Sequence, residues 1–268
     1  MTRTLLKAIA CLLPSVLLAP AVQADATLTM KEIGGNVDSI IEVKGHMIRL
    51  STPGDPDYML YDAKRDAAIH VNGTDKQYME IDRASMAKMA NSVAQIRQQI
   101  APQMEMMRQQ LKNLPPEQRA MIEQQMGGVA NMGAMETKPV TKVTTVKRGS
   151  DEIAGFKCQR YDVMKDTARV GDVCVATEPG AGMSKADFST VRSAMKFMRD
   201  MAESAEEMAA GMGGPELAIG DVDGVPVSAK DIQNGREYEL VSVSDAALDD
   251  ARFNAYRAMK KEELPSIR

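Results

Sequence analysis

The chain has 268 residues, of which 33 are basic and 37 acidic, and 44% of it is hydrophobic. This length can bury a core as one domain or two. The mildly acidic balance argues against nucleic acid as a partner, because binding to its phosphates needs clustered cations.

Residues 1–24 are predicted to be a cleaved secretory signal peptide. Arg3 and Lys7 precede an uncharged apolar run from Ala8 to Ala21, and Val22-Gln23-Ala24 then places small residues at a signal-peptidase site. The run is too short for a membrane helix, which needs ~20 apolar residues. We therefore expect an exported chain, 25–268, in the periplasm or secreted, without a transmembrane segment. Loss of the two cations leaves 31 basic against 37 acidic residues, a net charge of −6.

The first third of the exported chain predicts an antiparallel β-meander. Short runs with apolar–polar alternation, such as Met47-Ile48-Arg49-Leu50 and Tyr78-Met79-Glu80-Ile81, are separated by Gly, Pro and Asn-Gly turn signals. Short strands with one polar face fit an antiparallel sheet. The expected strands cover 27–33, 37–44, 46–51, 58–62, 67–71 and 77–82.

A Met-rich helical segment follows, at about 84–126. From Met86 to Leu114 apolar residues recur every third or fourth position, which predicts one apolar stripe along a helix. Pro102 is expected to kink or split this helix. Pro115 opens a second, shorter helix, which ends at Gly127. The Gly-, Met- and Ala-rich residues 127–138 predict a flexible linker.

Strands return at 139–148, 155–163 and 170–177, and a second Met-rich helical insertion covers about 184–210. Ser184 and Asp187 resemble a capping box at its start. Two last strands, 225–232 and 236–243, flank Asn234-Gly235, a signal for a two-residue hairpin turn. Residues 246–261 predict a short helix.

The two cysteines that remain after cleavage, Cys158 and Cys174, predict a disulfide, since an even pair is typical of exported chains. A hairpin that turns around Asp166 places them directly opposite each other. The same register places Arg160 opposite Asp172, an attractive cross-strand pair. A redox or metal-binding pair is the alternative, but redox pairs usually have the spacing C-x-x-C.

The segment Gly155–Val163, with the sequence GFKCQRYDV, and the segment Val173–Ala176, VCVA, resemble the core signature of a bacterial exported family named domain of unknown function 4412. The helix start at Leu114–Arg119 and the late strand pair are also similar to that family. Its members resemble the periplasmic lipoprotein carriers, whose fold is an open half-barrel of antiparallel strands that holds helices against its concave face. The resemblance implies an apolar groove, but no catalytic residue.

Catalysis has little support in the sequence. The two histidines, His46 and His70, lie after a turn and inside a short strand, and no nucleophile elbow accompanies them. Glu203, Glu206 and Glu207 lie on the polar side of a helix. Residues 221–224 resemble the opening of a calcium loop but lack its later ligands. We expect neither an enzyme nor a cofactor.

Methionine is the distinctive feature, because the exported chain holds 21 Met against nine Leu. Flexible thioether side chains pack into irregular cores, and they also suit promiscuous apolar binding surfaces. A third interpretation makes them soft ligands for Cu(I), with Met104, Met106 and Met107, or Met195 and Met198, as ligands. The sequence does not separate core filling, groove and metal site. The expected groove residues are Met86, Met89, Val93, Ile96, Met104, Met107, Met195 and Met198.

Together these patterns predict one α+β domain, 25–268: a curved antiparallel sheet, or open half-barrel, with Met-rich helices inserted between strands and packed on its concave face. The expected function is non-enzymatic binding of an acyl chain, a lipid, a lipidated protein or another apolar partner surface in a Met-lined groove. A Cu(I)-binding envelope protein and a structural envelope component are the alternatives.

Processing gives the first testable prediction. The exported protein should begin at Asp25, because Ala24 ends the small-residue site, and N-terminal sequencing of protein from the periplasm or medium measures this directly. The residues Ala8–Cys11 loosely match a lipidation box, although the apolar run continues past Cys11. A lipid-modified Cys11 at the N-terminus would contradict both the cleavage site and the expected location.

Overall fold

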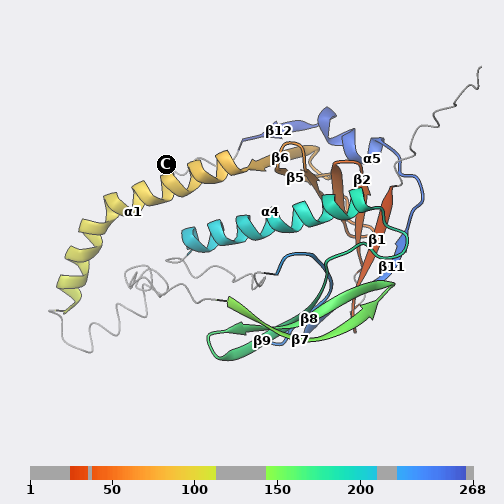
Figure 1. The fold of residues 1–268 in the computed structure, drawn as a ribbon. Coiled ribbons are helices and arrows are strands. Elements are labelled where there is room, and N and C mark those ends of the chain that lie inside the picture. Colours follow the sequence, from red (N-terminus) through yellow and green to blue (C-terminus); the bar gives the residue numbers. More distant parts are fainter. Residues whose placement is uncertain (1–24, 36–37, 113–142, 210–221, 264–268) are drawn as a thin grey trace, which may run out of the picture.

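The computed structural model describes residues 25–35, 38–112, 143–209 and 222–263. Within these residues a single sheet of twelve strands carries the fold, in the order β12-β6-β5-β4-β3-β2-β1-β11-β10-β9-β8-β7. Neighbouring strands are antiparallel, except for the parallel pair β12 and β6. The sheet is open, with β12 and β7 at its edges, and it curves around helix α4 (Figure 1). The predicted α+β class with a curved antiparallel sheet is therefore confirmed.

The predicted strands all form, most with shifts of one or two residues at their ends, but β7 runs to Ile153 instead of ending at 148, and β12 is an addition that the sequence did not predict. Residues 139–142, at the start of one expected strand, lie outside the described residues. Residue 37, the first of another expected strand, lies outside the described residues. The strands are β1 (Ala26–Glu32), β2 (Asp38–Lys44), β3 (Met47–Ser51), β4 (Tyr58–Asp62), β5 (Ala67–Asn72), β6 (Gln77–Asp82), β7 (Val143–Ile153), β8 (Phe156–Lys165), β9 (Ala168–Ala176), β10 (Val225–Asp231), β11 (Arg236–Ser244) and β12 (Lys260–Glu262).

Side chains alternate between the two faces of the sheet, as strand geometry requires. On β3 and β4, Ile48 and Tyr61 belong to the main core with α4, whereas Met47 and Leu60 belong to a second, smaller core on the opposite side. We call the side that α4 covers the inner face and the opposite side the outer face. Both faces of the β3–β5 region are therefore partly covered.

Helix α4 (Lys185–Ala209) lies against the inner face. The backbone N–H of Asp187 donates to Ser184 Oγ at 3.1 Å, which confirms an N-cap at the predicted position. Its apolar stripe enters the main core through four fully or almost fully buried side chains: Phe188, Val191, Ala194 and Phe197. In Figure 1, β5 and β6 lie on one side of α4, and β7–β9 lie on the other.

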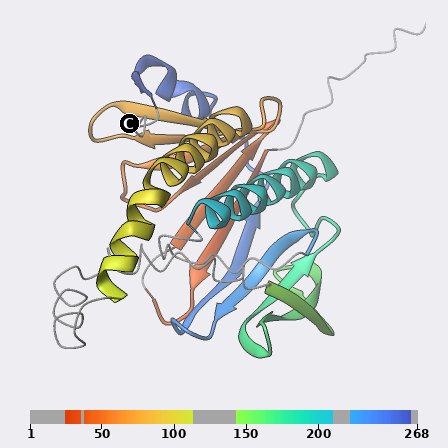
Figure 2. The same cartoon turned by 90° about the vertical axis from the view of Figure 1, so that its left-hand side faces the viewer.

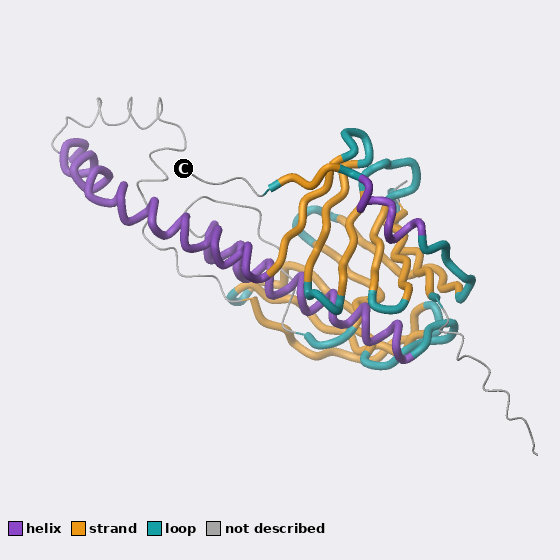
Figure 3. The backbone as a smooth tube through the Cα atoms, turned by 90° about the horizontal axis from the view of Figure 1, so that it is seen from above, coloured by secondary structure: helices purple, strands orange, loops and turns teal. Residues whose placement is uncertain are grey.

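Helix α1 (Arg83–Lys112) directly follows β6 and contacts both β6 and α4. Pro102 does not split it, although the ring removes the backbone donor to the carbonyl of Gln98. Figure 1 shows the helix bending along its length, and its C-terminal half extends beyond the strands (Figures 1 and 3). The second predicted helix and the expected linker at 127–138 lie outside the described residues.

The outer face is covered by the C-terminal segment. Instead of one helix over 246–261, the chain forms α5 (Ala251–Asn254) and the 3₁₀ helix η1 (Ala255–Ala258) and then β12. Phe253 and Tyr256 are buried against Leu60 and Ile69 of the outer face. Phe253 and Tyr256 are three residues apart, so one or two helical turns are enough to bury both side chains. A longer helix would bury no further apolar side chain against this core.

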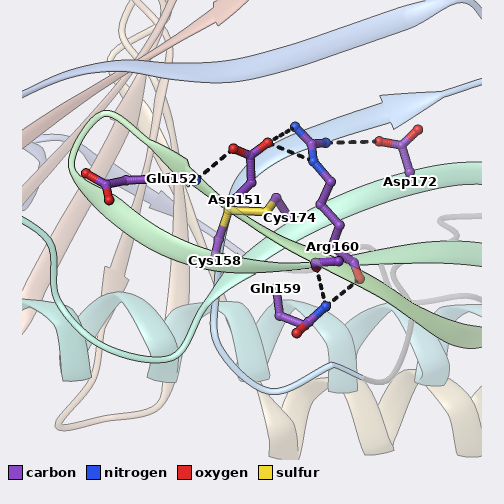
Figure 4. The surroundings of a disulfide bond; sticks show 8 residues. Asp151, Glu152, Cys158, Gln159, Arg160, Asp172 and Cys174 are labelled. Atoms are coloured by element: carbon purple, nitrogen blue, oxygen red, sulfur yellow. Dashed lines mark hydrogen bonds and ion pairs between the residues drawn. A yellow bond between two sulfur atoms is a disulfide. The ribbon is translucent and has the colours of Figure 1, made fainter.

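The disulfide between Cys158 and Cys174 is present, but the predicted register is wrong. The two sulfur atoms lie 2.07 Å apart and the Cα atoms 5.5 Å apart (Figure 4). Cys158 pairs with Ala176 and Cys174 with Arg160, because the turn lies at 166–167 and a bulge at Val170 adds a residue to β9. The bridge therefore joins diagonal neighbours, which strand twist brings together. Arg160 reaches Asp172 along the same diagonal, at 3.8 Å, and also binds Asp151 at 2.6 Å.

A second hairpin also differs from its prediction. Asp231 pairs with Arg236, so four residues, Ile232–Gly235, connect β10 and β11 instead of Asn234-Gly235 alone. The carboxylate of Asp231 accepts hydrogen bonds from the backbone N–H groups of Gln233 and Asn234 at 2.8 and 3.1 Å. These two hydrogen bonds from backbone N–H groups to the Asp231 side chain stabilise the longer turn.

The disulfide closes a 16-residue separation and should stabilise the fold by about 3 kcal/mol. Replacing both Cys158 and Cys174 by Ser should lower the free energy of unfolding by about 2–4 kcal/mol, measured by urea denaturation. Dithiothreitol should lower the stability of the unaltered protein by a similar amount and leave the double-serine variant unchanged. Two free thiols in the unfolded, unreduced exported protein would contradict the assignment.

Candidate functional site

The N-terminal end of α1 is tied to the sheet and to α4 by Arg83. Its guanidinium binds Asp66, after β4, at 2.5 Å and Asp200 of α4 at 2.6 Å. The same group lies 5.8 Å from the ring centroid of Phe197, and that ring packs against Tyr61 at 5.2 Å. Arg83 therefore fixes the start of α1 beside the middle of α4, and the two helices are neighbours there (Figure 2).

Burial and hydrogen bonding set the charge states in this anchor. The pKa of Tyr61 is raised, first by burial and then by the hydrogen bond that its hydroxyl donates to Asp66 at 2.9 Å. Burial alone would raise the pKa of Asp200, but hydrogen bonds from Lys196 and Arg83 outweigh it and lower the pKa. The stabilisation from these ion pairs is therefore present above the unfolded-state pKa of Asp200 and is lost as the pH falls through its lowered folded-state value.

A row of six residues crosses the inner face next to α4. Successive register pairs join Leu28 to Ile41, Ile41 to Leu50, Leu50 to Met59, Met59 to His70 and His70 to Met79. Directly opposed residues share a face. Leu50 and Met59 each lie two positions from a core residue that contacts α4, so the row belongs to the inner face. We call Leu28, Ile41, Leu50, Met59, His70 and Met79 the inner row.

The inner row changes from buried to open along its length. Leu28 is only 2% exposed, and Ile41 packs against the main core. Leu50 is 36% and Met59 38% exposed, His70 is exposed, and Met79 is half-buried. Single exposed apolar residues are ordinary on protein surfaces. Leu50 and Met59 are directly paired and continue the apolar run of Leu28 and Ile41, so these four residues form an apolar strip beside α4 that ends at His70.

The expected groove residues are distributed over both helices. On α4, Met195 is half-buried beside the main core and Met198 is 37% exposed. On α1, Met86, Met89 and Ile96 are half-buried, and farther along Ile100 and Met106 are 38% and 58% exposed. The side chains of Val93, Met104 and Met107 are outside the described residues. Whether the α1 methionines share a groove with the sheet stays a prediction.

The charged clusters elsewhere hold the fold together. Glu42, 3% exposed, is paired with Arg49 at 2.9 Å and with Arg252 of α5 at 2.7 Å. Asp62, also 3% exposed, binds Arg65 at 2.7 Å on the same outer face. These pairs fasten the C-terminal segment and a turn. Among the described residues, no group of three or more His, Cys, Asp or Glu is placed to hold a metal ion.

None of the helices in the described part of the chain combines the length and apolarity needed to cross a bilayer.

The exposed part of the inner row was not identified from sequence as a site. The alternation of apolar and polar residues in β3 and β6 predicted that Leu50 and Met79 lie on the same face of the sheet as other apolar residues of their strands. Their meeting across four strands depends on register, which alternation alone does not provide.

No family model and no curated protein match the chain. Among solved structures, an uncharacterized conserved protein from Thermus thermophilus is similar, with 7% identity, 91% of this chain and 92% of that chain covered, and a TM-score of 0.38. PNGF-II is 8% identical, with 91% of this chain and 31% of that chain covered, and a TM-score of 0.42. Similarity at this level assigns no family, so the resemblance to domain of unknown function 4412 and to the lipoprotein carriers stays a prediction.

The Arg83 anchor gives a prediction about α1. Arg83→Gln should change the free energy of unfolding by only ~0–1 kcal/mol, since its ion pairs are half-exposed. It should, however, speed amide hydrogen exchange in the first turns of α1. Phe197→Ala, by contrast, should cost ~3–5 kcal/mol, because the ring is 2% exposed.

Arg192→Gln is the matched control for the exchange measurement. Arg192 is similarly exposed on α4, and its partner is Asp223 rather than a residue at the start of α1. Faster exchange of α1 in the Arg192 variant, or unchanged exchange in the Arg83 variant, would contradict the role of Arg83.

Proposed function

We propose that the protein binds a hydrophobic ligand, an acyl chain or a lipid, on the inner face of the sheet, without catalysing a reaction. The observation that carries this proposal is the directly paired, exposed Leu50 and Met59, which lie between Ile41 and His70 in the inner row. A curved sheet with a helix along one side gives an extended ligand apolar contact on two sides. When a ligand covers paired apolar side chains that were in contact with water, the free energy of the system falls, and this favours binding.

The side chains of the strip suit a chain-like ligand. Met59, and Met79 beyond His70 in the same row, have unbranched, polarizable side chains that adapt to ligands of different shape. An acyl chain needs no polar partner along its length, which agrees with a row in which only His70 is polar. Export to the periplasm, inferred from residues 1–24, would bring the protein to the compartment where lipids and lipidated proteins travel between membranes.

Displacement of an apolar fluorescent dye by fatty acid or phospholipid tests the proposal. Replacing both Leu50 and Met59 by Ser should weaken dye and fatty-acid binding at least tenfold. The melting temperature should fall by only a few degrees, because both side chains are already more than one-third exposed. Replacing both Met86 and Met89 by Ala then tests whether α1 contributes to the same site.

A second double variant, with Val241 and Ile232 both replaced by Ser, serves as the control. These residues are 47% and 43% exposed, and Val241 lies on the outer face because its neighbour Leu240 is in the main core. The control should bind dye and fatty acid as the unaltered protein does. Equal loss in both double variants, or no fatty-acid binding by the unaltered protein, would refute the proposal.

A further inference from the structure

The open end of the inner row contains a histidine between two methionines. On β5, His70 is directly opposed to Met59 of β4 on one side and to Met79 of β6 on the other. All three share the inner face, and His70 and Met59 are exposed while Met79 is half-buried. The sequence separates these residues by 11 and 9 positions, so their juxtaposition arises only from the two hairpins.

The strand geometry lets both sulfur atoms approach one imidazole. Directly opposed Cβ atoms lie ~4.5–5.5 Å apart in an antiparallel pair. The two methionines therefore begin ~10 Å apart, with the imidazole between them. Each Met side chain has three rotatable bonds and is long enough to bring its sulfur over the ring from its own side. A single ion above His70 is thus within reach of one nitrogen and two thioethers.

Two thioethers and one neutral imidazole form a soft, uncharged donor set. Thioethers select Cu(I), and imidazole is also a good copper ligand, whereas Ca²⁺ and Mg²⁺ require oxygen donors. Of the residues paired in this row, the nearest carboxylate is Glu262, which lies on β12 beyond Met79. The set therefore matches a soft monovalent cation better than Zn²⁺, which in proteins is held by four donors from Cys, His and carboxylates.

We propose that Met59, His70 and Met79 form a binding site for a soft monovalent cation, Cu(I) or its analogue Ag(I). This site differs from the one considered on sequence grounds, where Cu(I) ligands were sought among the helical methionines. It also goes beyond ligand binding by the apolar strip, because it depends on His70 and Met79 rather than on Leu50.

Ag(I) is the probe, since it needs no reductant and leaves the disulfide intact. The exported protein, purified without an affinity tag, holds two histidines, so its imidazole NMR signals come from His46 and His70 alone. A His46→Asn variant assigns them. Ag(I) nitrate should shift the His70 signal to saturation and leave that of His46 unchanged. Absence of a His70 shift at saturating Ag(I) would overturn the proposal.

The thioethers are tested by replacing both Met59 and Met79 by Leu, which keeps volume and folding nearly unchanged. This double variant should bind Ag(I) at His70 at least tenfold more weakly. Met198→Leu is the matched control, because Met198 is 37% exposed on α4 and Met59 is 38% exposed. Equal binding by the double variant, or an equally tight shift of His70 by Zn²⁺, would mean that the imidazole acts alone and would refute the site. Leu50→Ser should leave Ag(I) binding intact, which separates this test from the lipid experiment.

Discussion

The apolar side of α4 contacts strands from both ends of the chain, and this contact organises the molecule. Phe188, Val191, Ala194 and Phe197 are buried in a core that also contains Val43 and Ile48 from the first half of the sheet and Val225 and Val227 from the last. Among the described strands, β1–β6 and β7–β11 hydrogen-bond to each other only where β1 meets β11. Burial of α4 against both halves therefore favours the curved arrangement over a flat sheet, because a flat sheet would leave much of the helix stripe in water.

Curvature around α4 leaves the inner face unequally covered. The helix lies along the row that contains Val43, Ile48, Tyr61 and Ala68 and crosses near the β2–β3 turn, where Thr190 Oγ1 donates to the carbonyl of Gly45 at 2.9 Å. The inner row lies two residues farther along each strand, where Leu50 and Met59 remain partly open. On the outer face, Phe253 and Tyr256 cover the corresponding region, and Glu42, Arg49 and Arg252 hold that cover in place. Within the β3–β5 region the open apolar surface therefore lies on the inner face.

The two proposals assign different chemistry to neighbouring parts of that side. Leu50 and Met59 provide the apolar contact area for a chain-like ligand, whereas His70 with Met59 and Met79 provides donors for a soft cation. Met59 belongs to both sets, because a thioether is both a flexible apolar group and a soft ligand. Ligand and cation would consequently compete for Met59, and the Leu50→Ser variant separates the two functions because it leaves all three proposed cation donors in place.

Local patterns in the sequence predicted the types of the elements and much of their order. Period-two alternation bounded by turn residues located every predicted strand, period-3.6 stripes located α1 and α4, and an even cysteine pair indicated the disulfide. These signals are local, since each depends on residues within one element or on a simple count. The C-terminal helix was predicted over a longer range than α5 and η1 cover, and β12 was missed, because three-residue strands and single turns are too short to show a period.

Which residues meet across the sheet became visible only in the folded structure. The two-residue turn at 166–167 and the bulged residue Val170 each moved the β8–β9 register by one position, and together they converted the expected direct cysteine pair into a diagonal one. Register is also what places His70 between Met59 and Met79, residues that nothing in the local sequence connects. The physical reason is that pairing depends on the position and length of every turn and bulge together, and a change of one residue in any of them alters all the cross-strand partners beyond it.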